Sequence, residues 1–346
     1  MERAYRDYFQ HQEYRPHPKG LPEARQAIAR YYAAAGAAVD PENLILTSGT
    51  SESFLYLFHL LGPQGGNFLT PAPAYPLFES IAELARVELR HYPLREDKAW
   101  SLDLAALEAG CDRETRGIFL ISPHNPTGAV AGAEEIRALV ELCDRKNLAL
   151  ICDEVFAEFY FGEGVFPRPL VLTRPRLLFT LNGLSKMFAL PGLKLSWIAV
   201  SGEAEKVAAA VDWLETQADT FLSCHTPIQK ALPALLQEGA PFLADYRREV
   251  RRRRDLALQL LGGNGKIRVI PPAGGFYLTA EILPPFPLEE EDFVLRLMEE
   301  EGVFVHPGYF YDYERGVHFT VSFLTEPAIL TRGLEKTLKL IHRLSA

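Results

Sequence analysis

The sequence predicts an α/β fold with a mostly parallel sheet covered by helices, followed by a smaller α+β region. Between about residues 40 and 200, short apolar segments typical of strands alternate with helix-forming segments, which favours a parallel sheet. After one long expected helix at residues 240–261, short strand-like segments dominate. We therefore expect a large domain over residues 26–245 and a small domain made of residues 246–346 and 1–25.

The individual elements are marked by apolar runs and by residues that open helices. In the large domain we expect strands at 43–47, 67–70, 117–122, 148–153 and 177–181, and helices at 22–35, 54–61 and 134–146. Proline is favoured in the first helical turn, so Pro22 is well placed to open its helix. In the small domain we expect strands at 266–270, 274–279, 303–305 and 317–323, and helices at 291–301 and 327–344.

The composition is typical of a globular protein that works on small molecules. Of 346 residues, 48% are hydrophobic and 23% charged, and the formal net charge of -9 argues against nucleic-acid binding. No apolar run approaches the roughly 20 residues of a membrane span, and the N-terminus lacks the apolar core of a signal peptide. The four cysteines show no metal-ligand spacing. We expect a cytoplasmic protein with reduced cysteines and with no nucleic-acid or membrane partner.

A turn of small residues connects the first expected strand to its helix. The residues Gly49, Thr50 and Ser51 lie where backbone N–H groups and the helix dipole favour an anion such as phosphate. Turns of this kind are common in α/β proteins, so this stretch alone leaves phosphate binding and a plain connection both open.

Three further polar or aromatic residues follow the ends of later strands. Tyr75, Asn125 and Asp153 each come directly after or at the end of an apolar run. Ligands of α/β sheets gather at the carboxyl ends of the strands, so these residues are candidates for one binding site. A core position for Tyr75 and an arginine partner for Asp153 are the alternative interpretations.

Lys186 follows the next expected strand and has apolar neighbours, among them Leu184, Met187 and Phe188. Removal from water lowers the pKa of an ammonium group, and a neutral amine is a nucleophile that forms a Schiff base with a carbonyl. The alternative is an ordinary surface lysine.

Pyridoxal 5'-phosphate would satisfy all five features at once. Its phosphate needs N–H donors, its aldehyde needs a lysine, and its ring needs a stacking face. Its phenolic oxygen needs a hydrogen-bond donor, and its ring nitrogen needs a carboxylate to remain protonated. We therefore expect this cofactor.

These residues stand in motifs that extend over nearly the whole chain, and the chain resembles the class I/II aminotransferases of pyridoxal-phosphate fold type I. The motifs are Ser48–Glu52, Pro73–Pro76, His124–Gly128, Asp153–Glu154, Ser185–Lys186, Pro191–Gly192 and Gly274–Phe276. The resemblance implies a seven-stranded type of large-domain sheet and a homodimer with active sites at the subunit interface.

The resemblance also implies roles for individual residues. Lys186, preceded by Ser185, would be the Schiff-base lysine and would carry the proton between the substrate Cα and the cofactor C4' atom. Asp153 would pair with the pyridinium, Asn125 would donate to O3', and Tyr75 would stack on the ring.

Further residues would hold the phosphate. Thr50 and Ser51 in the turn that begins at Gly49 would bind it, with Lys194 in the place of a family arginine. Tyr14 would reach the phosphate of the neighbouring subunit.

The chain departs from the family pattern at four positions. Phe156 replaces a tyrosine that hydrogen-bonds O3', and its loss should raise the pKa of the lysine–cofactor linkage. Gly183 replaces a serine or threonine, and Lys194 lacks the bidentate fork of arginine. Thr320 stands where the family has the arginine that clamps the substrate carboxylate, and His318, on the same strand face, is a weak substitute candidate.

We expect a transaminase that moves an amino group from an amino acid or amine to a 2-oxo acid. A lyase, decarboxylase or racemase of the same fold is one alternative, because no arginine fixes the substrate carboxylate. A non-catalytic protein that binds the cofactor is another, suggested by Phe156, Gly183 and Thr320. The sequence does not identify the donor or the acceptor.

Overall fold

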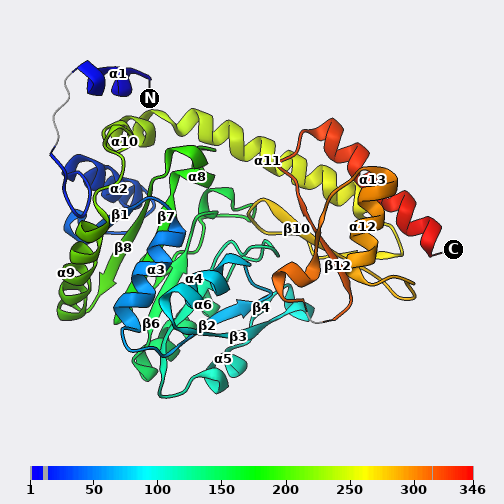
Figure 1. The fold of residues 1–346 in the computed structure, drawn as a ribbon, viewed down its shortest axis with the longest axis horizontal. Coiled ribbons are helices and arrows are strands. Elements are labelled where there is room, and N and C mark those ends of the chain that lie inside the picture. The colour runs from blue at the N-terminus through cyan, green and yellow to red at the C-terminus, as the bar shows by residue number, and fades with distance from the viewer. Residues whose placement is uncertain (1, 11–14, 314, 346) are drawn as a thin grey trace.

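The structure is a computed structural model that describes residues 2–10, 15–313 and 315–345 (Figure 1). It confirms the α/β fold class, with one eight-stranded and one four-stranded sheet. The large sheet lies among helices on both faces, and the small sheet lies beside it under the long helix α11 (Figure 1).

The large sheet has the strand order β1-β8-β7-β6-β5-β2-β3-β4. Its strands are β1 Leu44–Thr47, β2 Asn67–Ala72, β3 Glu88–Arg95, β4 Ser101–Leu102, β5 Thr115–Ile121, β6 Ala149–Asp153, β7 Leu177–Gly183 and β8 Ser196–Gly202. The run β3-β2-β5-β6-β7 is parallel, whereas β1, β8 and β4 pair antiparallel with their neighbours. The expected seven-stranded type is therefore present, and the two-residue β4 adds an eighth strand.

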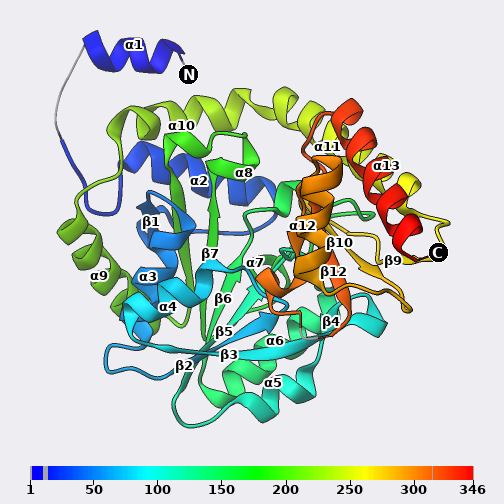
Figure 2. The same ribbon diagram turned by 45° about the vertical axis from the view of Figure 1, so that its right-hand side comes forward.

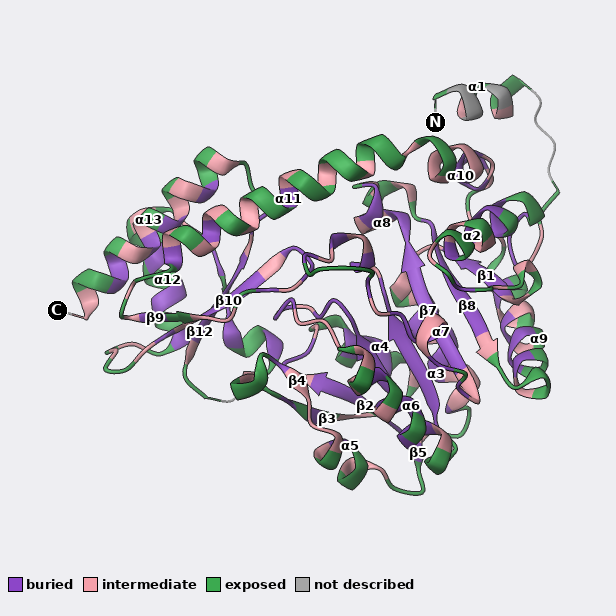
Figure 3. Ribbon diagram, turned by 180° about the vertical axis from the view of Figure 1, so that it is seen from behind, coloured by how far each residue is buried: buried purple, intermediate pink, exposed green. Residues whose placement is uncertain are grey.

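Two groups of helices cover the large sheet. One face carries α2 Pro22–Ala34, α5 Leu104–Gly110, α6 Ala133–Lys146, α7 Pro169–Leu172 and α10 Thr226–Glu238. The other face carries α3 Thr50–Leu61, α4 Leu77–Ala85 and α9 Ala204–Phe221. Strand residues alternate between these faces, so Cys152 packs toward the first group while Ile151 and Asp153 face the second. Figure 3 shows that the central strands are buried along most of their length.

The small sheet is antiparallel, in the order β11-β12-β10-β9. Its strands are β9 Ile267–Val269, β10 Tyr277–Ile282, β11 His306–Pro307 and β12 Val317–Ser322, and its helices are α11 Ala240–Leu261, α12 Glu290–Glu301 and α13 Pro327–Leu344. The prediction of a strand at 303–305 is wrong, because pairing with β12 begins only at His306. The strand expected at 274–279 lies three residues further along the chain, after the Gly274–Gly275 turn.

The N-terminal segment divides between two places. Leu21 and Ala24 lie in the core on the α2 face of the large sheet, and the backbone N–H of Leu21 donates to Gln229 Oε1 at 2.7 Å. This part of residues 1–25, which we expect to complete the small domain, packs on the large sheet, because Leu21 has its apolar partners there. The other domain boundaries remain a prediction.

Helix α1, Glu2–Gln10, lies at the edge of the molecule, apart from both sheets (Figure 2). Tyr5 makes a ring contact with His225 at 6.2 Å, next to α10. Across residues 2–10, 15–313 and 315–345, none of the helices has the length and apolar character that a membrane crossing requires.

Candidate active site

The predicted site residues come from the carboxyl ends of neighbouring parallel strands. Tyr75 follows β2, Asn125 follows β5, and Asp153 ends β6. Lys186 lies in the short helix α8, Leu184–Met187, which begins directly after β7 and also contains Ser185. Because β2, β5, β6 and β7 run parallel, these residues lie along one edge of the sheet.

Asp153 is a buried carboxyl group without an ion-pair partner among the described residues. It accepts a hydrogen bond from the Val155 backbone N–H at 3.0 Å. The pKa of Asp153 is raised to about 7, chiefly by burial and to a smaller extent by the charge of Glu154, while the Val155 hydrogen bond and Lys186 act in the opposite direction. A buried carboxylate is costly unless a cation lies beside it, so this position favours a positively charged ligand group.

Lys186 is the titratable neighbour of Asp153. Burial lowers the pKa of its ammonium group, and the charge of Asp153 opposes that shift only in part. Its Nζ atom lies 5.8 Å from the ring centre of Phe156, on the side of the small sheet, where Phe156 packs against Phe276 at 5.0 Å. The lysine is therefore closer to the neutral, nucleophilic form than a lysine in water.

The anion-binding turn is completed by a lysine from another part of the chain. Gly49 precedes the first helical residue, Thr50, and Ser51 follows in the first turn of α3. A Cβ atom added to Gly49 would lie 3.7 Å from the Nζ atom of Lys194, so the ammonium group stands beside this helix N-terminus. Two sources of positive potential thus meet at one place, which favours a phosphate group.

Gly183 is explained by the strand beside it. It pairs with Ser196 of β8, which also pairs with Thr47 of β1. A Cβ atom added to Gly183 would lie only 2.3 Å from Ser196 Oγ and 2.9 Å from the Leu195 carbonyl oxygen. The hydroxyl that the family carries at position 183 has no room here, and a serine hydroxyl from β8 occupies that space instead. Sequence reasoning missed Ser196 because strand pairing, not sequence distance, brings it to the site.

Asn125 and Tyr75 border the same region. Asn125 Oδ1 is buried and has no hydrogen-bond partner among the described residues, so the amide can still bind a ligand. Burial raises the pKa of the half-buried Tyr75, and Tyr277 and Asp153 add to this effect. Tyr277 and Tyr75 likewise contribute to the raised pKa of Tyr311, which burial dominates. Tyr277 and Tyr311 come from the small-sheet region, and Tyr277 was not identified from the sequence, because no motif marks it.

Two residues of β12 bear on how the substrate carboxylate is held. Thr320 is buried, and its hydroxyl is 3.2 Å from the hydroxyl of Thr279 on the paired strand, so it offers no positive charge. His318 lies beside Glu96, Glu281 and Glu290, which disfavour a negatively charged substrate group there. His318 is therefore rejected as the substitute for the family arginine. Tyr14 lies outside the described residues.

The fold and the arrangement of the site identify an α/β enzyme with a large and a small sheet and a desolvated lysine between them. The family model for class I and II aminotransferases matches residues 10–332, and the chain belongs to this family. Its activity is therefore that of an aminotransferase.

Individual relatives agree with this assignment. The chain is 28% identical to the glutamate-pyruvate aminotransferase AlaA of Escherichia coli K12, over 92% of this chain and 80% of that protein. It is 27% identical to the tyrosine aminotransferase of Mus musculus, over 90% of this chain and 69% of that protein. These relatives favour transamination over the lyase and non-catalytic alternatives.

Solved structures agree as well. An aminotransferase from Escherichia coli has a TM-score of 0.89 and 26% identity, with 98% of this chain and 85% of that chain covered. A double mutant of Thermus thermophilus aspartate aminotransferase has a TM-score of 0.87 and 27% identity, with 98% and 87% covered.

Proposed function

We propose that this aminotransferase uses pyridoxal 5'-phosphate bound through a Schiff base to Lys186, and that it moves an amino group from an amino acid to a 2-oxo acid. When bound, the cofactor supplies an aldehyde that takes up the amino group and a ring that withdraws electrons from the substrate. The observation that carries the proposal is the pairing of buried Asp153, which lacks a cation, with desolvated Lys186.

Each group of the cofactor has a matching residue. The α3 N-terminus, with Thr50 and Ser51, and the Lys194 ammonium group suit the phosphate. Asp153 suits the protonated ring nitrogen. The side-chain N–H of Asn125 would be the donor to the phenolic oxygen.

Lys186 is the residue that we propose moves the proton. Its lowered pKa increases the share of neutral amine, and a neutral Nζ atom can take a proton from the substrate Cα. Tyr75 would cover one face of the ring and keep water from it. Phe156 brings no hydroxyl group, so Asn125 would be left as the side-chain donor to the phenolic oxygen.

The substrate carboxylate requires a different partner from the family arginine. Beyond the larger effect of burial, Tyr277 and Asp153 raise the pKa of Tyr75, and Tyr277 and Tyr75 raise the pKa of Tyr311, so these three tyrosines belong to one region of the site. We propose that these tyrosine hydroxyl groups, together with backbone N–H groups near the cofactor, donate hydrogen bonds to the substrate carboxylate. Relatives act on glutamate and pyruvate or on tyrosine, so these three compounds are the first substrates to test.

We further propose a cytoplasmic homodimer with a large domain from about residue 26 to 245 and a small domain from 246 to 346. All four cysteines are unpaired, which suits a reducing compartment. The position of α1 at the edge of the molecule suits a segment that reaches a second copy (Figure 2). Tyr14, which follows α1, would then reach the phosphate of the neighbouring active site.

The test is the visible absorption spectrum of the purified protein with pyridoxal phosphate. Wild type should develop a visible band, Lys186→Ala should not, and the exposed control Lys146→Ala should behave as wild type. Glutamate or tyrosine should then bleach the band and yield the matching 2-oxo acid. Release of ammonia or carbon dioxide would support the lyase alternatives, and a Lys186-dependent band that no amino acid alters would contradict the proposed substrate class.

A further inference from the structure

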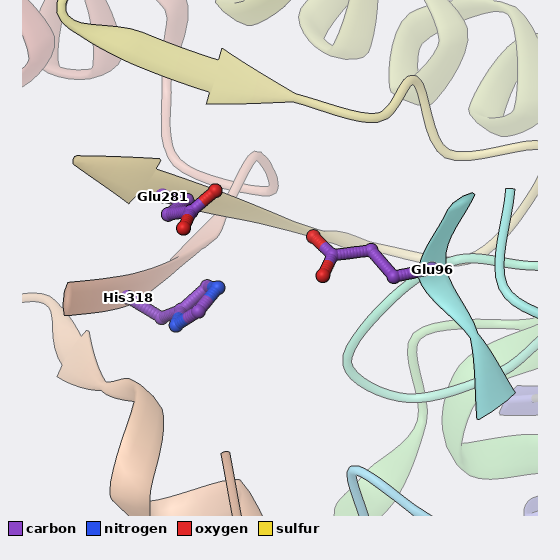
Figure 4. Close-up of side chains that lie close together, drawn as sticks. All are labelled: Glu96, Glu281 and His318. Carbon is purple, nitrogen blue, oxygen red and sulfur yellow. The ribbon is translucent and has the colours of Figure 1, made fainter. Parts of the chain in front are cut away.

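A second cluster of chemistry-bearing side chains lies where the small sheet meets the large one. Glu96 begins the 3-10 helix η2, Glu96–Lys98, after β3, while Glu281 and His318 face each other across β10 and β12. One ligand atom from each of the three residues lies within 4.8 Å of the others. Figure 4 shows that the three side chains point toward one common space.

His318 is a buried member of this cluster whose ring nitrogens lack hydrogen-bond partners in the described part of the chain. Its side chain is 4% exposed, yet neither ring nitrogen has a hydrogen-bond partner among the described residues. Its Nδ1 atom is 3.7 Å from Glu290 Oε1, too far for a hydrogen bond, and its ring stacks on Tyr313 with centroids 4.3 Å apart. A buried polar nitrogen without a partner is costly, which points to a missing ligand.

The carboxylates keep oxygen atoms available on the histidine side. Arg268 binds Glu281 Oε2 at 2.6 Å and Glu96 Oε1 at 2.9 Å, which occupies one oxygen of each residue. Glu281 Oε1 lies toward His318, because a Cβ atom added to Gly316 would be 3.0 Å from this oxygen and 2.9 Å from His318 Cε1. The arginine therefore orients both carboxylates and leaves their second oxygens free.

Within the part of the chain that the structure describes, the ion pairs do not balance the charge of the cluster. Three carboxylates, Glu96, Glu281 and Glu290, face one guanidinium group, Arg268, which leaves a net charge of -2 when His318 is neutral. Glu290 is already bound by the backbone N–H groups of Tyr309 and His318. A proton on His318 would cancel half of this charge, whereas a divalent cation would cancel all of it.

We propose that Glu96, Glu281 and His318 form a binding site for a divalent first-row metal cation, Mn²⁺ or Zn²⁺. One imidazole nitrogen and two carboxylate oxygens suit these ions, and water can complete the coordination. Glu96 belongs to the connection between two strands of the large sheet, and the other two ligands belong to the small sheet. The ion would therefore join the two sheets, and this inference does not depend on the identity of the cofactor or the substrate.

The experiment is metal binding to the full chain after treatment with a chelator. Free Mn²⁺ is followed by electron paramagnetic resonance, and Zn²⁺ is added as a competitor. We expect one saturable Mn²⁺ site per chain that Zn²⁺ displaces, and at least tenfold weaker Mn²⁺ binding in His318→Gln and Glu281→Gln. The exposed control His342→Gln should bind as wild type.

A thermal shift provides the second readout. Mn²⁺ should raise the melting temperature of wild type and His342→Gln in proportion to the logarithm of its concentration, and should not raise that of His318→Gln or Glu281→Gln. If His318→Gln does not fold, Glu96→Gln takes its place, because Glu96 is partly exposed. Absence of a saturable site in wild type, or unchanged binding in the folded ligand variants, would overturn the proposal. Zn²⁺ binding that survives these substitutions would place the ion at other residues and would likewise overturn the proposal.

Discussion

At the scale of single residues, burial has opposite effects on the two central groups. It lowers the pKa of Lys186 and raises the pKa of Asp153 to about 7. In the protein without a cofactor, the neutral amine and the neutral carboxylic acid are therefore more populated than they would be in water. A cationic ring nitrogen beside Asp153 would restore its charge. Binding of a protonated pyridine should therefore be coupled to loss of a proton from this carboxyl group.

This coupling gives a pH prediction for the cofactor-free protein. Between the ordinary aspartate pKa of 3.8 and about 7, folded Asp153 keeps a proton that the unfolded chain has lost. Its contribution to the free energy of unfolding is thus fully present below the lower value and falls as pH rises, by at most about 1.4 kcal/mol per pH unit. The substitution Asp153→Asn removes this pH-dependent contribution to the free energy of unfolding.

The measurement is urea unfolding of wild type and Asp153→Asn across this pH range without cofactor. The variant should become progressively more stable relative to wild type as pH rises toward 7, and the difference should level off above that value. Parallel stability profiles at all pH values would show that the carboxyl group is ionised in the folded protein throughout.

The site residues that could be predicted from the sequence are those that stand in a recognisable motif. Lys194 was expected at the phosphate because it stands where the resembled family has an arginine, and its Nζ atom lies beside Gly49. Tyr277 and Ser196 could not be expected, because their position near the site follows from the packing of distant segments. The roles of all these residues await experiment.

At the scale of elements, the β7–β8 pair determines which side chains fit at position 183, three residues before Lys186. Gly183→Ser would push a Cβ atom against Ser196 Oγ and the Leu195 carbonyl oxygen. We expect a loss of about 1–3 kcal/mol in the free energy of unfolding, as for other overpacked sites. Adding Ser196→Gly should recover only part of the loss, because the Leu195 carbonyl remains 2.9 Å away.

A double-mutant cycle of Gly183→Ser and Ser196→Gly measures this coupling by chemical denaturation. Gly192→Ser is the matched control, since a Cβ atom there meets nothing within 4 Å and the change should stay within about 0.5 kcal/mol. Purely additive effects of the two substitutions would mean that the strands separate locally and that the steric argument fails.

The strands that the sequence did not reveal have a common explanation. β3 buries only two of its eight residues, so its apolar pattern is weak. β8 follows the lysine-containing turn without a clear boundary in the sequence. By contrast, β5, β6 and β7 are buried on both faces and appear as apolar runs in the sequence.

At the scale of the whole molecule, the proposed dimer predicts complementation between two inactive variants. If Tyr14 completes the site of the neighbouring subunit, Lys186→Ala and Tyr14→Ala homodimers should both be strongly impaired. A mixed dimer contains one site with both residues intact, so unfolding and refolding the two variants together should restore part of the transaminase activity.

The control is a mixture of the same two proteins that has not been refolded, which should stay impaired. Size-exclusion chromatography should show dimers in both cases. No recovery in a mixture proven to contain mixed dimers would place Tyr14 in its own subunit's site or outside any site.

Local sequence was sufficient for the fold class, for most buried strands and for Lys186, Asp153 and Asn125, because each depends on an apolar run followed by a few residues at its end. The fit of Ser196 against Gly183, the hydroxyl groups around Tyr277, and the cluster of Glu96, Glu281 and His318 required the folded chain. Strand pairing and sheet-to-sheet packing bring these residues together from distant segments, and such contacts depend on the geometry of the whole core rather than on any local pattern.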